Sequence, residues 1–343
     1  MWFGVRKLDS TDGLEGATLA HSLQMPGGKR LRKGHVLTPA DIDAMKEAGV
    51  AEITVAIPEA GDMKEDAAAA HIADVFGLDG FRREDVGTGR VNFHAVDDGL
   101  LVLRPERVDA LNRIDPAITL ATLPNHSFVS AGQMIATVKI IPFAVSDALV
   151  EKAAAEVQKP DTIVVRPFRA GIRATMIQTR VTGTKSTVLD KTHRVTEARL
   201  KRLHARIAHE SRVAHSVAAL SAEIAEQIAS ADMVLIFGAS AVTDRRDVVP
   251  QAIEYAGGRI IHVGMPVDPG NLLVLGEISG KPVIGAPGCA RSPKENGFDW
   301  VLQRLCAGIA VTADDIVAMG VGGLLTEIPI RPHPRERANP VER

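Results

Sequence analysis

The second half of the chain alternates short apolar runs with amphipathic stretches. Apolar runs at residues 173–179, 233–237, 259–263 and 282–284 predict strands, and residues 195–208, 221–228, 248–255 and 297–306 predict helices. Strands that alternate with helices are typical of a parallel sheet covered by helices on both faces. We therefore predict an α/β fold, with a three-layer α/β/α domain around a mostly parallel sheet.

The first half has a less regular pattern. Thr38 and Pro39 predict the N-cap and the first residue of a helix, and residues 53–57 predict a short strand. Residues 61–76 are acidic and rich in alanine, which predicts an amphipathic helix. Further strands are predicted at residues 91–96, 100–103, 118–123 and 134–143. This pattern predicts a smaller mixed α/β region before the three-layer domain.

The change of pattern near residue 155 predicts a domain boundary. Residues 146–158 predict a helix, Lys159, Pro160 and Asp161 interrupt it, and a new apolar run starts at Thr162. A length of 343 residues also favours two cores over one. We predict an N-terminal mixed α/β region over 1–155, the α/β domain over 156–310, and a C-terminal extension over 311–343 that ends in a mobile tail from residue 332.

Composition excludes several classes of partner. Aromatic residues make up 3% of the chain, too few for stacking the bases of single-stranded nucleic acid, and a net charge of -2 provides no field that attracts polyanions. Two cysteines fit a reducing compartment. No stretch predicts a signal peptide or a membrane span. We therefore expect a cytoplasmic protein that binds neither nucleic acid nor membrane.

Three loops of the predicted α/β domain carry residues suited to ligand binding, because ligands of such sheets lie beyond the carboxyl ends of the strands. Small residues let the backbone approach a ligand, hydroxyl groups donate hydrogen bonds, and lysine attracts phosphate. A solvated loop is the alternative, and composition alone favours it. The first loop consists of Thr182, Gly183, Thr184, Lys185 and Ser186, and Asp190 follows it.

The second loop begins with Gly238, Ala239 and Ser240, between a predicted strand and a predicted helix. Free N–H groups at the start of a helix attract anions. Asp247, at the end of this loop, has two interpretations. It caps the helix over 248–255, which is the more common role, or it holds a metal ion or a polar ligand edge.

The third loop region contains Asp268, Pro269 and Gly270, followed after the next predicted strand by Pro287 and Gly288. Each Pro-Gly pair predicts a tight turn, and two such turns after consecutive strands suggest the rim of a site. Cys289 lies close to Arg291 in sequence, which can activate a thiol, but a buried cysteine is the more common case. The histidines of the chain show no metal-ligand spacing, and the basic stretch near residue 200 is best explained as a solvated helix face.

The order of these loops resembles the molybdopterin-binding domain shared by molybdenum insertases and molybdopterin adenylyltransferases. The family pattern has a Thr-Gly after the first strand, then a Gly-Gly loop with Ser or Thr and an Asp, then two Pro-Gly loops. The resemblance covers residues 162–310, and residues 28–50 look like a segment that precedes this domain in insertases. The chain departs from this pattern in three loops. Ala239 stands in place of the second glycine of the Gly-Gly loop. Lys185 and Ser186 stand where the family has an acidic residue and a leucine after the first Thr-Gly, and Cys289 and Ala290 stand where it has Asn-Pro.

The resemblance implies molybdopterin as the ligand and a place in molybdenum cofactor biosynthesis, with a chain similar to a bacterial subgroup in which such a region precedes a molybdopterin cytidylyltransferase-like domain. Asp190 and Asp247 would be the catalytic and Mg²⁺-binding carboxylates of nucleotidyl or molybdate transfer with ATP or CTP. A molybdopterin cytidylyltransferase or a molybdoenzyme would be a partner, and a homo-oligomer is expected. Two alternatives stay open: a nucleotide- or sugar-phosphate-binding α/β enzyme, and a pterin carrier without turnover. The residues that would bind the cofactor are Thr182, Gly183, Thr184, Ser186, Gly238, Ala239, Ser240, Asp268, Pro269, Gly270, Pro287 and Gly288.

Overall fold

The computed structural model describes residues 1–9 and 13–325. The chain divides into two compact units, Met1–Pro167 and Phe168–Arg343. The predicted helix over 146–158 and the strand after it lie in the first unit, as α4 (Asp147–Val157) and β14 (Ile163–Pro167). The tail predicted from residue 332 lies outside the described residues.

The N-terminal part of the first unit is built on a small antiparallel sheet. The core beneath it contains Leu14, Met45 and Val55. Sheet order is β1-β5-β2, and β3 pairs with β4 in a separate hairpin. The elements are β1 (Trp2–Lys7), β2 (Thr18–Leu19), β3 (Leu23–Gln24), β4 (Arg30–Leu31), α1 (Pro39–Glu47) and β5 (Glu52–Ile57).

The start of α1 confirms the predicted cap at Thr38. The Thr38 hydroxyl accepts a hydrogen bond from the N–H of Asp41 at 3.2 Å, and the Asp41 carboxylate accepts one from the N–H of Thr38 at 3.2 Å. Asp41 is buried and also lies 2.8 Å from Nε2 of His35. The hydrogen bonds from His35 and Thr38 hold the pKa of Asp41 well below its ordinary value.

Asp41→Asn is therefore expected to lower the free energy of unfolding of this part by about 1–2 kcal/mol near neutral pH. Because the pKa of Asp41 is depressed in the folded chain, its stabilisation is present above the unfolded pKa of about 3.9 and is lost as pH falls below it. The gap in free energy of unfolding between the original chain and the Asp41→Asn variant should therefore become smaller in acid. Trp2 fluorescence during denaturation, in a Trp300→Phe background, measures this gap, and Asp43→Asn on the exposed face of α1 is the matched control. A gap that stays constant down to about pH 3 would contradict the assignment.

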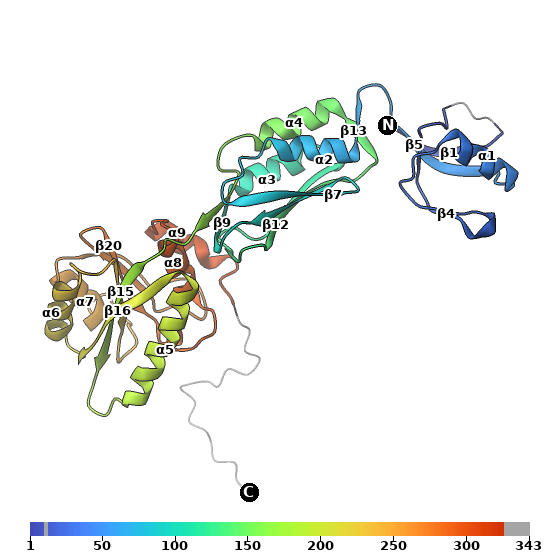
Figure 1. Cartoon of the computed structure of the whole chain (residues 1–343). Coiled ribbons are helices and arrows are strands. Elements are labelled where there is room, and N and C mark those ends of the chain that lie inside the picture. The colour runs from blue at the N-terminus through green and yellow to red at the C-terminus, as the bar shows by residue number, and fades with distance from the viewer. Residues whose placement is uncertain (10–12, 326–343) are drawn as a thin grey trace, which may run out of the picture. The chain divides into compact units, whose positions relative to one another are not determined.

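In the rest of the first unit, α2 and α3 pack against a four-stranded antiparallel sheet of order β10-β12-β8-β7, and α4 packs on these two helices (Figure 1). Phe76, Phe81 and Phe93 pack together in its core. Smaller sheets pair β11-β9-β14 and β13-β6. The elements are β6 (Asp62–Lys64), α2 (Glu65–Asp74), β7 (Phe81–Gly87), β8 (Arg90–Ala95), β9 (Gly99–Leu103), α3 (Pro105–Asn112), β10 (Ile118–Thr122), β11 (Phe128–Val129), β12 (Met134–Ile140), β13 (Ala144–Ser146), α4 and β14.

The helix predicted over 61–76 is wrong at its start. Residues 62–64 form β6, which pairs with β13, a strand about eighty positions later in the chain, and α2 begins only at Glu65. The strand β7 and the helix α3 have no counterpart in the prediction. Residues 82–85 of β7 are charged, and side chains on both faces of this edge strand reach solvent, so the apolar alternation is lost.

The second unit confirms the predicted three-layer α/β/α fold. Its six-stranded sheet has the order β16-β15-β17-β20-β19-β18, and every strand is parallel to the others except β19. Helices α6 and α7 pack on one face. Helices α5 and α8 cover the other face, where Phe298 of α8 contacts Phe237 of β17. The elements are β15 (Ile172–Arg180), α5 (Ser186–Arg202), β16 (Ala205–Ala214), α6 (Val217–Gln227), β17 (Met233–Phe237), α7 (Val248–Tyr255), β18 (Arg259–Val263), β19 (Val274–Ile278), β20 (Lys281–Ala286), η2 (Gly288–Arg291), α8 (Gly297–Cys306), α9 (Ala313–Val317) and η3 (Ala318–Gly320).

The helix predicted over 195–208 is wrong at both ends. α5 begins at Ser186, and residues from 205 onward belong to β16, which the pattern does not predict. As an edge strand, β16 carries mostly polar and partly exposed side chains, so it lacks the apolar run of a central strand. β19 is also unpredicted, because Gly276 interrupts its run. A Cβ at Gly276 would lie 2.9 Å from the carbonyl oxygen of Arg259 on the paired strand β18.

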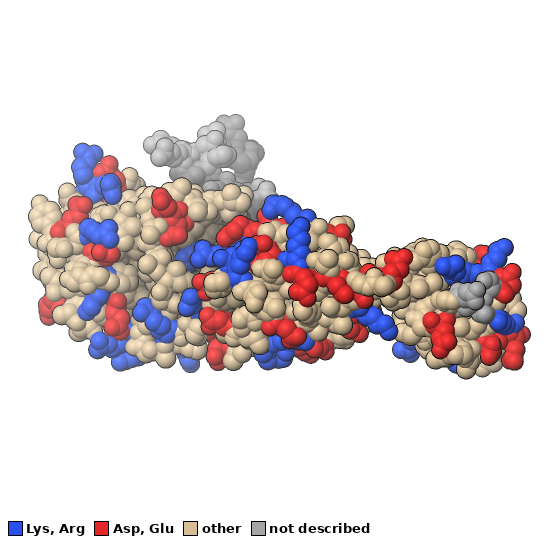
Figure 2. All heavy atoms as spheres, turned by 90° about the horizontal axis from the view of Figure 1, so that it is seen from above, with Lys and Arg blue, Asp and Glu red and all other residues tan. Residues whose placement is uncertain are grey.

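Charged side chains of both signs are mixed over the face seen in Figure 2. This mixture agrees with the small net charge of the chain. Within residues 1–9 and 13–325, no helix has both the length and the apolar character needed to cross a bilayer.

Candidate functional site

A pocket of about 210 Å³ opens at the carboxyl ends of β15, β17 and β20, three adjacent parallel strands. This is the position that the sheet topology favours for a ligand. Most of the lining is apolar or backbone, and Arg291 is its one charged side chain. The lining residues are Thr179, Thr184, Val188, Leu189, Gly238, Ala239, Ser240, Ala241, Val242, Ala286, Pro287, Gly288 and Arg291.

The loop between β17 and α7 forms one wall. Gly238 is needed there, since a Cβ would lie 2.8 Å from the carbonyl oxygen of Ser240. The N–H of Ala239 donates to Oγ1 of Thr179 at 2.8 Å, and the same oxygen lies 2.8 Å from Nδ1 of His215. Within the described chain the next three N–H groups of the loop, at residues 240–242, have no hydrogen-bond acceptor. They are therefore available to a ligand with acceptor atoms.

The loop between β15 and α5 forms a second wall. Oγ1 of Thr184 accepts a hydrogen bond from the N–H of Val181 at 3.0 Å, which closes a turn around Gly183, whose φ is +87°. Thr184 lines the pocket together with two residues of the first turns of α5. Thr182, Gly183 and Ser186 belong to the same loop but are exposed and do not line the pocket.

The guanidinium of Arg291 closes the third side. Its Nη1 donates to Oγ1 of Thr192 at 2.7 Å, and its Nη2 donates to the carbonyl oxygen of Gly238 at 2.9 Å. The ring of Phe237 lies 5.5 Å from the guanidinium carbon. Burial lowers the pKa of Arg291, and among the described residues it has no carboxylate partner. The pocket thus contains a cation whose charge no carboxylate of residues 1–9 and 13–325 neutralises.

The two carboxylates expected at the site lie elsewhere. Asp190, on α5, forms an ion pair with Arg212 at 2.6 Å. Asp247 caps α7: it accepts a hydrogen bond from the N–H of Val248 at 2.7 Å and another from the N–H of Thr243 at 3.2 Å. Neither lines the pocket, and the described residues contain no cluster of three or more histidine, cysteine or acidic side chains suited to a metal. The role of these two carboxylates as Mg²⁺ ligands therefore stays a prediction.

The two Pro-Gly loops differ in position. Pro287 and Gly288 line the pocket, whereas Asp268, Pro269 and Gly270 do not. The peptide bond between Asp268 and Pro269 is cis, and the carbonyl oxygen of Pro269 accepts the N–H of Gly297 at 2.9 Å. The loop of Asp268, Pro269 and Gly270 therefore fixes the start of α8.

A buried arginine fixes the segment that carries Arg291. Arg199, on α5, is 8% exposed and lies 2.7 Å from the carboxylate of Asp299. It also donates to the carbonyl oxygens of Ala290 at 2.5 Å, Ser292 and Lys294. One side chain thus connects α5, the residues around η2, and α8.

Cys289 does not have the environment of a nucleophile. It is half-buried, and burial raises the pKa of its thiol. A raised pKa keeps the sulfur protonated near neutral pH, where the thiolate is the reactive form.

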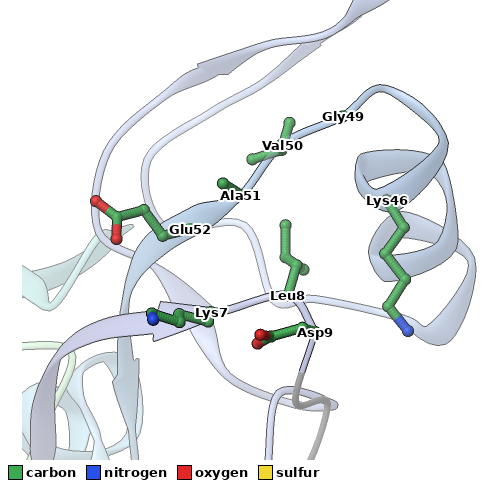
Figure 3. Close-up of a pocket in the computed structure, with 8 residues that line it drawn as sticks. All are labelled: Lys7, Leu8, Asp9, Lys46, Gly49, Val50, Ala51 and Glu52. Carbon is green, nitrogen blue, oxygen red and sulfur yellow. The ribbon is translucent and has the colours of Figure 1, made fainter.

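A second hollow lies in the first unit, beside β1 and α1 (Figure 3). Its volume is about 660 Å³. Two cations, Lys7 and Lys46, and two anions, Asp9 and Glu52, surround its apolar centre, so their charges offset each other. No residue expected at the site from the sequence lies here.

The structure brings together six of the residues expected to bind the cofactor: Thr184, Gly238, Ala239, Ser240, Pro287 and Gly288. Arg291 and Thr179 join them although the sequence does not single them out as ligand residues. The signal for Arg291 was its place in the loop after β20, and the signal for Thr179 was its place at the end of a buried strand with polar residues after it. Neither position in the sequence distinguishes a residue that lines the pocket from one that only stabilises the fold.

Comparisons with known proteins agree with this location. Residues 175–307 match a family model described as a probable molybdopterin binding domain, and residues 12–57 match one described as a domain of unknown function. The first match confirms the resemblance predicted from the loops: residues 175–307 are similar to a probable molybdopterin binding domain. No curated protein matches the chain.

Several solved structures are similar at low identity. A molybdopterin biosynthesis MoeA protein from Pyrococcus horikoshii is 14% identical with a TM-score of 0.31, and the match covers 72% of this chain and 79% of that one. A putative molybdenum cofactor biosynthesis protein from Corynebacterium diphtheriae is 15% identical with a TM-score of 0.29, covering 41% and 99%. A molybdenum cofactor biosynthesis protein from Pyrococcus furiosus is 10% identical with a TM-score of 0.25, covering 92% and 65%.

Proposed function

We propose that the pocket at the ends of β15, β17 and β20 binds molybdopterin, or its nucleotide- or molybdate-loaded form, during molybdenum cofactor biosynthesis. One observation carries the proposal: the pocket lies inside residues 175–307, the part of the chain that matches a probable molybdopterin binding domain. Its polar groups are hydrogen-bond donors and a cation, which suit the phosphate and the carbonyl oxygens of such a ligand.

Each wall has a role in this proposal. The N–H groups at residues 240–242 receive acceptor atoms of the ligand, and Arg291 neutralises its phosphate. The apolar side chains of Val188 and Val242 contact the ring system. The predicted ligand contacts of the remaining residues, which do not line the pocket, stay predictions; these residues are Thr182, Gly183, Ser186, Asp268, Pro269 and Gly270.

Asp247→Ala is expected to weaken molybdopterin binding by about tenfold, which corresponds to about 1.4 kcal/mol. The carboxylate caps α7 and holds the N–H of Thr243, so its loss loosens the wall formed by residues 238–247. Binding is measured directly through the fluorescence of molybdopterin titrated with the purified protein. No binding by the original chain would overturn the proposed function.

Asp247→Asn separates the two interpretations of this residue. Asparagine keeps an oxygen that can cap the helix but loses the charge. A capping role predicts an affinity closer to that of the original chain than the alanine variant has. Equal losses in both variants would instead assign the charge itself to the ligand or to Mg²⁺.

Transfer chemistry is the second step of the proposal. To test nucleotidyl transfer, Mg-ATP or Mg-CTP is added to the molybdopterin-loaded protein and the pterin products are analysed. To test molybdate insertion, molybdate is added together with a molybdoenzyme as the acceptor. The lining residues contain no carboxylate in the described chain, which favours binding without metal-dependent turnover. Saturable pterin binding without any product would support the carrier interpretation.

A further inference from the structure

We propose that the hairpin of β3 and β4 is a docking surface for an extended acidic segment of a partner protein, with carboxylates at every second position. The hairpin lies in the N-terminal part of the first unit (Figure 1) and inside residues 12–57, which match a domain of unknown function. The proposal goes beyond the proposed function and does not depend on the pocket of the second unit.

The hairpin has a local excess of positive charge, although the net charge of the whole chain is only -2. Residues 16–40 contain no aspartate or glutamate. Their four cations, all exposed, are Lys29, Arg30, Arg32 and Lys33. Lys29 lies 3.7 Å from the carboxylate of Asp41, and Lys33 lies over the ring of Phe143. Arg30 and Arg32 form no ion pair within residues 1–9 and 13–325, so a partner can use both charges.

The guanidinium groups of Arg30 and Arg32 lie on one side of β4. The two arginines flank Leu31, which is 4% exposed and packs in the core of the N-terminal part. Because side chains alternate along a strand, residues two positions apart point the same way, roughly 6.6 Å from each other. An extended peptide has the same period, so its carboxylates at positions i and i+2 can meet both arginines. Each planar guanidinium matches a carboxylate in a bidentate pair.

The hairpin is ordered by its own hydrogen bonds before a partner binds. Its turn at residues 27–28 consists of two glycines with positive φ, and the N–H of Met25 donates to the carbonyl oxygen of Lys29 at 2.8 Å across this turn. After β4, the N–H of Lys33 donates to Oγ of Ser22 at 3.0 Å. A backbone that is already fixed loses less conformational entropy on binding.

A protein segment suits this surface better than other polyanions. Residues 16–40 contain no aromatic side chain on which a nucleic-acid base could stack. The larger apolar side chains of the hairpin, Leu23, Met25 and Leu31, pack on the core of the N-terminal part, so none is free to enter a bilayer. The two-residue spacing of the arginines instead favours carboxylates on an extended peptide.

The test titrates two fluorescent peptides with the full chain at about 50 mM salt and follows their anisotropy. Both peptides have the same composition: one alternates glutamate with threonine, and the other has all its glutamates in one block. The alternating peptide should bind at least about threefold more tightly, and Arg30→Ser with Arg32→Ser should weaken its binding by about tenfold or more. The matched control, Arg90→Ser with Arg166→Ser, removes two exposed arginines from other strands of the first unit and should change affinity by less than about twofold.

A charge reversal distinguishes a lost contact from a lost fold. Arg30→Glu with Arg32→Glu, verified as folded by circular dichroism, should lose the glutamate peptide and bind a peptide that alternates lysine with threonine. Equal affinity for the alternating and block peptides, or equal losses in the Arg30/Arg32 and control variants, would overturn the inference. Tighter binding of a single-stranded oligonucleotide of equal charge, or of vesicles containing phosphatidylserine, would also overturn it, because the surface would then select phosphate groups.

Discussion

Arg199→Met is expected to lower the free energy of unfolding of the second unit by about 3–5 kcal/mol. The guanidinium is 8% exposed and forms an ion pair with Asp299, and it also donates to three backbone carbonyls between residues 290 and 294. Methionine fills similar space but leaves the half-buried carboxylate of Asp299 without a cation and removes the donor of three backbone carbonyls. Denaturation followed by Trp300 fluorescence, in a Trp2→Phe background, measures the loss in this unit.

A double-mutant cycle separates the ion pair from the backbone bonds. Asp299→Asn keeps an oxygen for the cap of α8, where the carboxylate accepts the N–H of Asn296 at 2.9 Å, but removes the charge. The double variant should be more stable than the sum of the two losses predicts, with a coupling of about 1–3 kcal/mol. Arg194→Met, exposed on the same helix, should change stability by less than about 0.5 kcal/mol. Equal effects at Arg194 and Arg199 would contradict the role of Arg199.

Gly270→Ala is expected to lower the free energy of unfolding by about 2–4 kcal/mol. The φ of Gly270 is +145°, which L side chains rarely adopt. An added Cβ would lie 2.7 Å from the backbone nitrogen of Gly297 and 2.9 Å from its Cα. Because both are backbone atoms at the start of α8, no side-chain rotation relieves the contact. The same Trp300 measurement applies.

Gly288→Ala is the matched control, since Gly288 lines the pocket and an added Cβ meets no atom within 4 Å. We expect its stability to change by less than about 0.5 kcal/mol. The pair distinguishes two Pro-Gly loops that look alike in sequence: one supports a helix and the other borders the pocket. A stable Gly270→Ala variant would show that this loop is free to move, contrary to its packing against α8.

Strong local signals account for what the sequence predicts correctly. β17 is an apolar run of five buried residues, and α7 follows directly after its cap at Asp247. The wrong predictions concern strands that form only by pairing with a segment distant in the sequence. β16 is partly exposed and half of its residues are polar or charged, so its pairing with β15 makes it a strand, and β6 pairs with the distant β13.

The same difference between local signals and distant contacts applies to the candidate site. Glycine and hydroxyl residues after strands indicate the loops, because glycine adopts the positive φ of turns and Ser or Thr hydroxyls form hydrogen bonds with turn backbone. Side-chain partners cannot be read from the chain order: Asp190 meets Arg212 through the pairing of β15 with β16, and Arg291 meets Thr192 across almost a hundred positions. The sequence pattern therefore predicts which loops form the pocket, whereas the three-dimensional fold determines which charged side chains line it.

The antiparallel strand β19 offers a practical attachment point. It joins β20 through a two-residue turn, Ser279 and Gly280, whose φ values are +50° and +75°. β20 runs from this turn to Ala286 at the pocket, a span of about 20 Å. A fluorophore or short peptide tag inserted at the turn would sit at the far edge of the sheet, near enough to sense changes in the second unit and too far to touch the ligand.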